Sequence, residues 1–235
     1  MLIQESLGLN TLTGLVPLVK KIILGTAIVE GAGAVLYATQ FIPEFGVGYG
    51  IWAAVFNSIS AFCNAGMDIV KEDSFRSYVT NPVINFTTMA LIVLGGLGFI
   101  VWKDLWQSMK KLIKEKIPVK RIVQQLKFQT KIVLSISTFL ILFGTVLIFL
   151  FEYHNPATMG NLSLPGKVMA SLFQAVTTRT AGFETVAQGA LTDASSLVLM
   201  FLMIIGGSPA GTAGGVKTVT FAILIFCVIS AAKQE

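Results

Sequence analysis

Charged side chains are scarce in this chain. Asp, Glu, Lys and Arg make up 12% of its 235 residues, whereas 54% of the residues are hydrophobic. A soluble domain carries about 25% charged residues. Half of that amount leaves too little charge to cover a surface exposed to water, so we expect lipid to surround much of the chain. The composition therefore argues against an ordinary soluble domain.

Residues that bind metals or transfer protons are also few. The chain has one histidine, His154, and two cysteines, Cys63 and Cys227, which both lie in apolar segments. Neither cysteine suggests a disulfide framework or a metal site. The net charge is +5, but most basic residues gather in residues 103–131. Such clustering indicates membrane topology and argues against a nucleic-acid partner.

Long apolar runs predict an all-α integral membrane protein. A run of about 20 apolar residues is long enough to cross a bilayer as a helix. The runs that we expect to cross are residues 22–42, 83–102, 132–151 and, with an interruption, 195–230. We expect residues 1–19 to form an interfacial lead-in and residues 231–235 to form a cytoplasmic tail.

The basic segment sets the expected orientation. Positively charged loops stay in the cytoplasm, so residues 103–130 are expected to be a basic cytoplasmic loop, and residues 71–80 and 152–166 to face outside. Glu30 lies within the first apolar run. A carboxylate at that depth marks a candidate functional site, although a structural role facing the interior of the bundle is the favoured alternative.

Two shorter apolar segments resemble one another. Residues 56–60 (Phe-Asn-Ser-Ile-Ser) match residues 173–177 (Phe-Gln-Ala-Val-Thr). Residues 65–70 (Ala-Gly-Met-Asp-Ile-Val) match residues 181–186 (Ala-Gly-Phe-Glu-Thr-Val), after a gap of one residue. Each copy lies between two apolar runs and is too short to cross, which predicts two units of helix, re-entrant loop and helix.

Such a unit suits a cation. The carboxyl end of a short buried helix carries partial negative charge, and an extended stretch after it can offer carbonyl oxygens in place of water. Gly66 and Gly182 would adopt backbone angles closed to other residues, and Asp68 and Glu184 would attract cations at the outer mouth. The alternative is that both copies are ordinary loops with glycine turns.

Glycine interrupts the last apolar run. Residues 206–215 read Gly-Gly-Ser-Pro-Ala-Gly-Thr-Ala-Gly-Gly. A straight helix does not tolerate glycine and proline at that density, so a broken membrane helix is predicted.

Residues 60–67, 177–183 and 206–217 form three motifs. These motifs resemble those of the Ktr/Trk/HKT superfamily of potassium transporters, and most closely those of the KtrB-type membrane subunit. The resemblance covers essentially the whole chain and implies four helix–loop–helix repeats around one pore. Residues 20–102 and 131–230 would be the second and third repeats, which makes the chain a fragment of a longer product or one piece of a split one.

The resemblance also implies the site residues. The selectivity filter would contain Asn64, Ala65, Gly66 and Met67, together with Thr180, Ala181, Gly182 and Phe183. An intramembrane gating loop would contain Gly206, Gly207, Ser208, Pro209, Ala210, Gly211, Thr212, Ala213, Gly214, Gly215 and Lys217. A passive kink is the alternative for this loop, and a side chain that extends toward the inner membrane surface is the alternative for Lys217.

By the same resemblance, the chain would belong to a multi-pass potassium-uptake protein of the cell membrane. It would bind no cofactor, transport K⁺, and have Na⁺ as a candidate coupling or activating ion. The complete subunit would form a homodimer with a cytosolic nucleotide-binding regulatory ring, and it would not be an enzyme. The alternatives are a secondary transporter of another fold, whose broken helices also hold substrate at mid-membrane, and a nonfunctional truncated product.

Overall fold

The computed structural model of the chain describes residues 15–71, 73–115, 118, 121 and 124–233. Regular structure within these residues is helical, apart from one isolated parallel bridge between Ile205 and Val216. The longer helices are α2 (Leu15–Phe45), α3 (Val47–Phe62), α4 (Pro82–Gly96), α5 (Phe99–Glu115), α7 (Phe128–Glu152), α8 (Leu164–Thr177), α9 (Asp193–Ile204) and α10 (Thr218–Lys233). The all-α prediction is confirmed.

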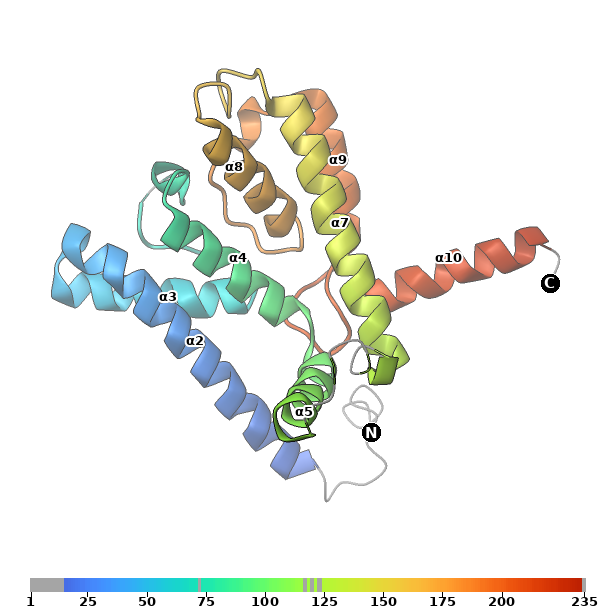
Figure 1. The fold of residues 1–235 in the computed structure, drawn as a ribbon. Helices are drawn as coiled ribbons and strands as arrows, with labels where there is room; N and C mark the ends of the chain where they lie inside the picture. The colour runs from blue at the N-terminus through green and yellow to red at the C-terminus, as the bar shows by residue number, and fades with distance from the viewer. Residues whose placement is uncertain (1–14, 72, 116–117, 119–120, 122–123, 234–235) are drawn as a thin grey trace.

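Helices α2 and α3 form a hairpin in which the chain reverses at Gly46, whose φ is 80°. They lie side by side in Figure 1. Helix α2 has 31 residues and begins before the predicted run, so the end of the expected lead-in is helical; residues 1–14 of that lead-in lie outside the described residues. Helix α3 has 16 residues, which is short for a membrane crossing, as predicted.

The expectation of one straight span over residues 83–102 is wrong. Helix α4 ends at Gly96, and α5 continues at an angle of 102° to it. In a continuous helix, the carbonyl of Gly95 would accept from the amide of Phe99. Here that amide donates to the Ala210 carbonyl at 3.0 Å, and the Gly95 carbonyl accepts from Thr212 at 3.1 Å. A distant loop therefore replaces the helical hydrogen bonds at the break.

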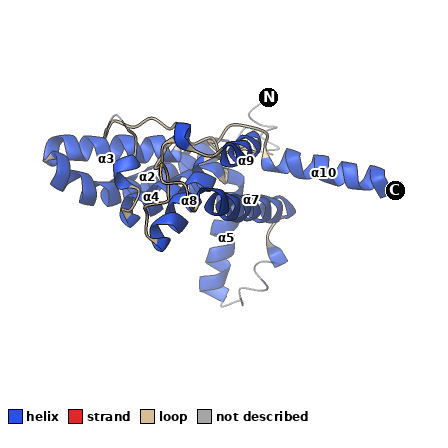
Figure 2. Cartoon of the chain, turned by 90° about the horizontal axis from the view of Figure 1, so that it is seen from above, coloured by secondary structure: helices blue, strands red, loops and turns tan. Residues whose placement is uncertain are grey.

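The basic segment predicted to be a cytoplasmic loop, residues 103–130, is helical up to Glu115 and again from Phe128, and its side of the membrane stays a prediction. Figure 2 shows α5 projecting from the slab formed by the other helices. The Asp104 carboxylate accepts a 3.0 Å hydrogen bond from the Lys127 amide at the start of α7. This bond satisfies a free donor at a helix amino terminus.

The second half contains α7, α8, α9 and α10. Helix α8 is the short helix predicted before residue 178, and α9 and α10 flank the predicted glycine-rich break. Within the described residues, Val16–Phe45 and Phe128–Glu152 are long and apolar enough to cross a membrane, and the bent pair of α4 and α5 passes the same test when it is taken together. Figure 1 shows α10 extending away from the other helices.

A shared core joins the two halves. Its buried aromatic residues come from both, and they are Tyr37, Phe41, Phe62, Phe75, Tyr78, Phe173 and Phe183. Helix α4 also packs against α8. This packing brings the carboxyl ends of the two short helices, α3 and α8, to the middle of the molecule.

Candidate functional site

The two short helices end in the same way. Neither α3 nor α8 has a basic residue in its last turn, so the partial negative charge of each carboxyl end is not offset there. A hydroxyl near each end then binds the returning chain. Ser60 Oγ donates to the Met67 carbonyl at 2.5 Å, and Thr177 Oγ1 donates to the Phe183 carbonyl at 2.6 Å. The two bonds span seven and six residues, which matches the one-residue gap between the copies in the sequence.

The backbones that follow the helices also correspond. Asn64 and Thr180 both have positive φ, at 51° and 64°, although neither is glycine. Two residues later, Gly66 and Gly182 have φ of 69° and 88°. Two non-glycine residues in a left-handed conformation at equivalent places indicate that the surrounding structure imposes that shape on both loops.

The two glycines lie against each other. A Cβ atom added to Gly66 would overlap the Ala181 carbonyl oxygen and would lie 2.8 Å from Gly182 Cα. One added to Gly182 would lie 3.2 Å from Gly66 Cα. Asn64 Nδ2 also donates across the two loops to the Arg179 carbonyl, at 3.5 Å. The structure thus brings both predicted filter segments, residues 64–67 and 180–183, together at the ends of α3 and α8.

The acidic residues beyond the glycines do not behave alike. The Glu184 carboxylate lies 2.5 Å from the Arg76 guanidinium, so its charge is already balanced. The predicted attraction of cations by Glu184 therefore competes with this ion pair and stays a prediction. Asp68 is partly buried, and no ion pair to it is present among the described residues.

Backbone hydrogen bonds join the two ends of the predicted gating loop. The Gly206 amide donates to the Val216 carbonyl at 3.0 Å, and the Val216 amide donates to the Ile204 carbonyl at 3.0 Å. The Thr218 amide adds a 3.0 Å bond to the Gly207 carbonyl. These bonds tie the end of α9 to the start of α10, so residues 206–215 leave the helical path and return to it.

The body of this loop contacts the end of α3, the predicted filter segment after α8, and α4. Thr212 Oγ1 donates to the Phe62 carbonyl at the end of α3, at 2.8 Å. The Gly214 amide donates to Thr180 Oγ1 at 2.8 Å. The loop can approach this closely because Gly95 has no side chain: a Cβ there would overlap the Phe62 carbonyl oxygen and would lie 2.7 Å from Thr212 Oγ1.

The basic residue at the end of the loop turns back toward it. Lys217 Nζ donates to the Ala213 carbonyl at 2.7 Å, and the side chain is partly buried. The Lys217 ammonium therefore supplies a hydrogen-bond partner for a backbone carbonyl of the loop.

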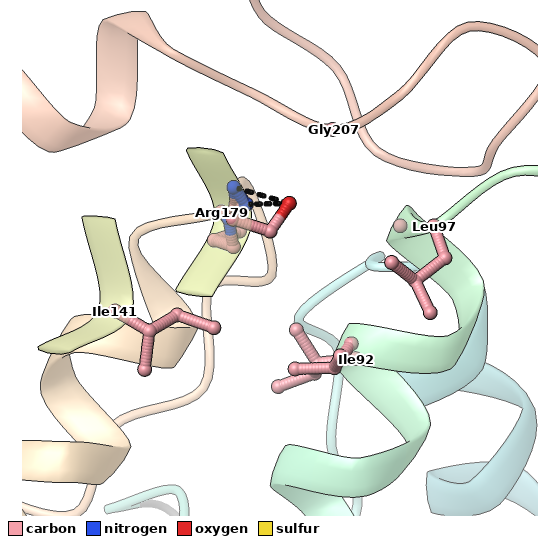
Figure 3. A pocket seen from close by; sticks show the side chains of 8 residues that line it. Ile92, Leu97, Ile141, Arg179 and Gly207 are labelled. Carbon is pink, nitrogen blue, oxygen red and sulfur yellow. Dashed lines mark hydrogen bonds between the residues drawn. The ribbon is translucent and has the colours of Figure 1, made fainter. Parts of the chain in front are cut away.

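Arg179 is a residue whose place the sequence analysis did not anticipate. It is 7% exposed, and its guanidinium donates to Ser137 Oγ of α7 at 3.1 and 3.2 Å. Figure 3 shows it at a small pocket that Ile92, Leu97, Ile141 and Gly207 also line. Among the described residues, no carboxylate lies within ion-pair distance of it. A single arginine in an apolar re-entrant segment is the sequence signal that could have identified it.

Comparison with known proteins places the chain in a family. Residues 4–235 match the family model described as "TrkH: Cation transport protein". The chain belongs to the TrkH family. Its relatives include "Ktr system potassium uptake protein B" of Vibrio alginolyticus, 38% identical over 234 residues, and "Potassium/sodium uptake protein NtpJ" of Enterococcus hirae, 35% identical over 223 residues. These matches cover 100% and 95% of this chain but 49% and 46% of the relatives, so the TrkH-family chain spans about half their length.

A solved structure supports the fold. The potassium transporter TrkH from Vibrio parahaemolyticus superposes with a TM-score of 0.67 and 19% identity, over 99% of this chain and 45% of that one. The match confirms a membrane fold with pore-loop helices. Together with the apolar helices and the family, it makes the chain a multi-pass membrane protein.

Proposed function

We propose that this chain supplies two of the pore loops of a potassium-uptake transporter. Residues 64–67 and 180–183 form its share of the selectivity filter. The observation that carries the proposal is the shared geometry of the two loops: each follows the carboxyl end of a buried short helix, has the same pair of positive φ angles, and contacts the other through its glycine.

The filter works through its backbone. Carbonyl oxygens replace the water shell of a K⁺ ion, and the partial negative charge at the ends of α3 and α8 stabilises the ion in front of them. The hydroxyls of Ser60 and Thr177 hold the returning strands at their outer ends. Transport of this kind makes and breaks no covalent bond, so the proposed function is not enzymatic. The names of the relatives support K⁺ as the transported ion, and NtpJ supports Na⁺ as a second one.

Residues 206–215 and Lys217 are proposed to form a gate at the inner base of the filter. The loop binds the end of α3 and the side chain of Thr180, so an ion that leaves the filter would meet it. Each of these contacts is a single hydrogen bond, which contributes only a modest net free energy. The loop also caps α4, which keeps a purely structural kink as the second candidate role.

Four expectations about the complete protein and its partners stay predictions. They are the presence of four repeats, the formation of a homodimer, the binding of a cytosolic nucleotide-binding ring, and the location of residues 103–130 in the cytoplasm.

The filter is tested in the complete protein, expressed in cells that lack potassium uptake. Gly182→Ser and Gly66→Ser are expected to lower the ratio of K⁺ to Na⁺ uptake about tenfold, since a side chain at positive φ costs about 1–2 kcal/mol and displaces the neighbouring strand. Gly189→Ser is the matched control, because a Cβ at that exposed glycine meets nothing within 4 Å.

An unchanged ratio in both filter variants, at normal membrane expression, would contradict the assignment. Measurement of K⁺ flux with and without a second ion gradient separates a pore from a secondary transporter of another fold.

A further inference from the structure

We propose that residues 73–78, which we name the outer strap, position the filter strand of the other repeat and thereby set ion discrimination. The inference rests on the proposed function of residues 180–183. The outer strap lies between α3 and α4 in the sequence and contains the short 3₁₀ helix Arg76–Tyr78. Its contacts, however, reach residues more than 100 positions away.

The backbones of the two segments are joined directly. The Phe75 amide donates to the Glu184 carbonyl at 3.0 Å, and the Glu184 amide donates to Ser74 Oγ at 3.4 Å. The outer strap thus binds both the backbone amide and the backbone carbonyl of Glu184. Ser74 has a φ of 54°, so the strap adopts a strained turn in order to make this contact.

The side chains next to these bonds fix the filter strand itself. The ring of Phe75 stacks on Phe183, with 5.1 Å between centroids and 9° between planes. Both rings are almost fully buried. The Phe183 carbonyl also accepts from Thr177 Oγ1. The last predicted filter residue is therefore held through its ring by the outer strap and through its carbonyl by its own helix α8.

The strap is anchored in turn to α2. Phe75 contacts the ring of Tyr37, with 6.2 Å between centroids. The Tyr78 hydroxyl donates to the Glu44 carboxylate at 2.6 Å. Burial, then the hydrogen bond to Glu44 and the Glu44 charge, raise the pKa of Tyr78, so the phenol stays protonated as a donor. The outer strap thus connects the filter strand of the second unit to helix α2 of the first.

An ion pair completes the contact. Arg76 Nη2 lies 2.5 Å from Glu184 Oε1, and both side chains are partly exposed. A pair of this exposure adds little to overall stability. The ion pair instead fixes the position of Glu184, which directly follows the filter segment. Discrimination between ions depends on where the carbonyls stand, so small displacements there change it.

The test compares charge reversals in the complete protein. Arg76→Glu and Glu184→Arg are each expected to lower the ratio of K⁺ to Na⁺ uptake about threefold, and the double variant is expected to restore it. Lys110→Glu is the control: Lys110 is exposed on α5, lies outside the outer strap, and forms no ion pair among the described residues. It should leave the ratio unchanged.

The ring contact gives a second and independent variant pair. Phe75→Leu is expected to lower the ratio and to raise the KM for K⁺, whereas Phe86→Leu makes the same change at a ring that is 56% exposed on α4 and should stay close to wild type. This pair tests whether the outer strap sets ion discrimination even if the double charge-reversal variant does not reach the membrane. Surface expression is measured for every variant, and the ratio is taken per molecule at the surface.

The outcomes separate the two proposals. If Gly182→Ser leaves the ratio unchanged, the filter assignment fails. If Gly182→Ser lowers the ratio but the Arg76, Glu184 and Phe75 variants change only the amount of protein, then the outer strap is purely structural and the inference is overturned. Failure of the double reversal to restore the ratio, in protein that reaches the surface, also overturns it.

Discussion

Thr212 offers the sharpest test of the proposed gate, because its two hydrogen bonds can be separated. Its amide donates to the Gly95 carbonyl at 3.1 Å, and its hydroxyl donates to the Phe62 carbonyl at 2.8 Å. Thr212→Val retains the amide and the branched shape but removes the hydroxyl. The substitution therefore weakens the contact between the loop and the end of α3, while the backbone contact with α4 remains.

The size of the effect follows from that single bond. A neutral hydrogen bond contributes about 0.5–1.5 kcal/mol net. A loss of about 1 kcal/mol from the closed arrangement raises the population of a minor open arrangement about fivefold. If residues 206–215 obstruct the path, K⁺ flux through the complete protein should rise by up to about fivefold. The ratio of K⁺ to Na⁺ uptake should stay constant, since the filter residues are untouched.

The assay is initial K⁺ uptake at saturating K⁺, per molecule at the cell surface. Thr220→Val is the matched control, because Thr220 is exposed on α10 and the same hydroxyl is lost there without any contact to α3. It should conduct like wild type. Flux through Thr212→Val that equals the control, at equal expression, would refute the reasoning that this hydrogen bond holds the path closed.

Two further predictions concern the loop and the orientation of the chain. Deletion of residues 210–214 from the complete protein should raise K⁺ flux, because it removes the part of the loop that contacts α3 and α4; wild-type flux at normal membrane expression would favour a passive kink. In a variant without Cys63 and Cys227, a cysteine at Lys114 should resist an impermeant thiol reagent added outside intact cells, and one at the exposed Ala157 should react. Labelling of the cysteine at position 114 from outside would contradict the predicted orientation.

The local chemistry of the sequence was enough to predict several features. Apolar runs and scarce charge predicted helices in lipid. The matching segments around Gly66 and Gly182 predicted two re-entrant loops, because hydroxyl, glycine and apolar residues recur in one order. The density of glycine in residues 206–215 predicted the break between α9 and α10. Each of these inferences depends only on residues close together in the chain.

Long-range contacts decided the rest. Residues 83–102 read as one apolar run, yet the helix breaks at Gly96 because the amides of Ser208 and Thr212 occupy the last carbonyls of α4. The length of an apolar run carries no information about a loop more than 100 residues later.

The outer strap and Arg179 show the same limit. Arg76 belonged to a predicted outer loop, Glu184 was predicted to attract cations at the outer mouth, and Arg179 was one residue of a motif. Folding places Arg76 against Glu184 and buries Arg179 against α7. The sequence by itself determined that most of the chain is apolar helix and that glycine interrupts the last run, since propensity and hydrophobicity are local. Only the tertiary structure decided which segments touch, because packing of the two halves on one core sets those contacts.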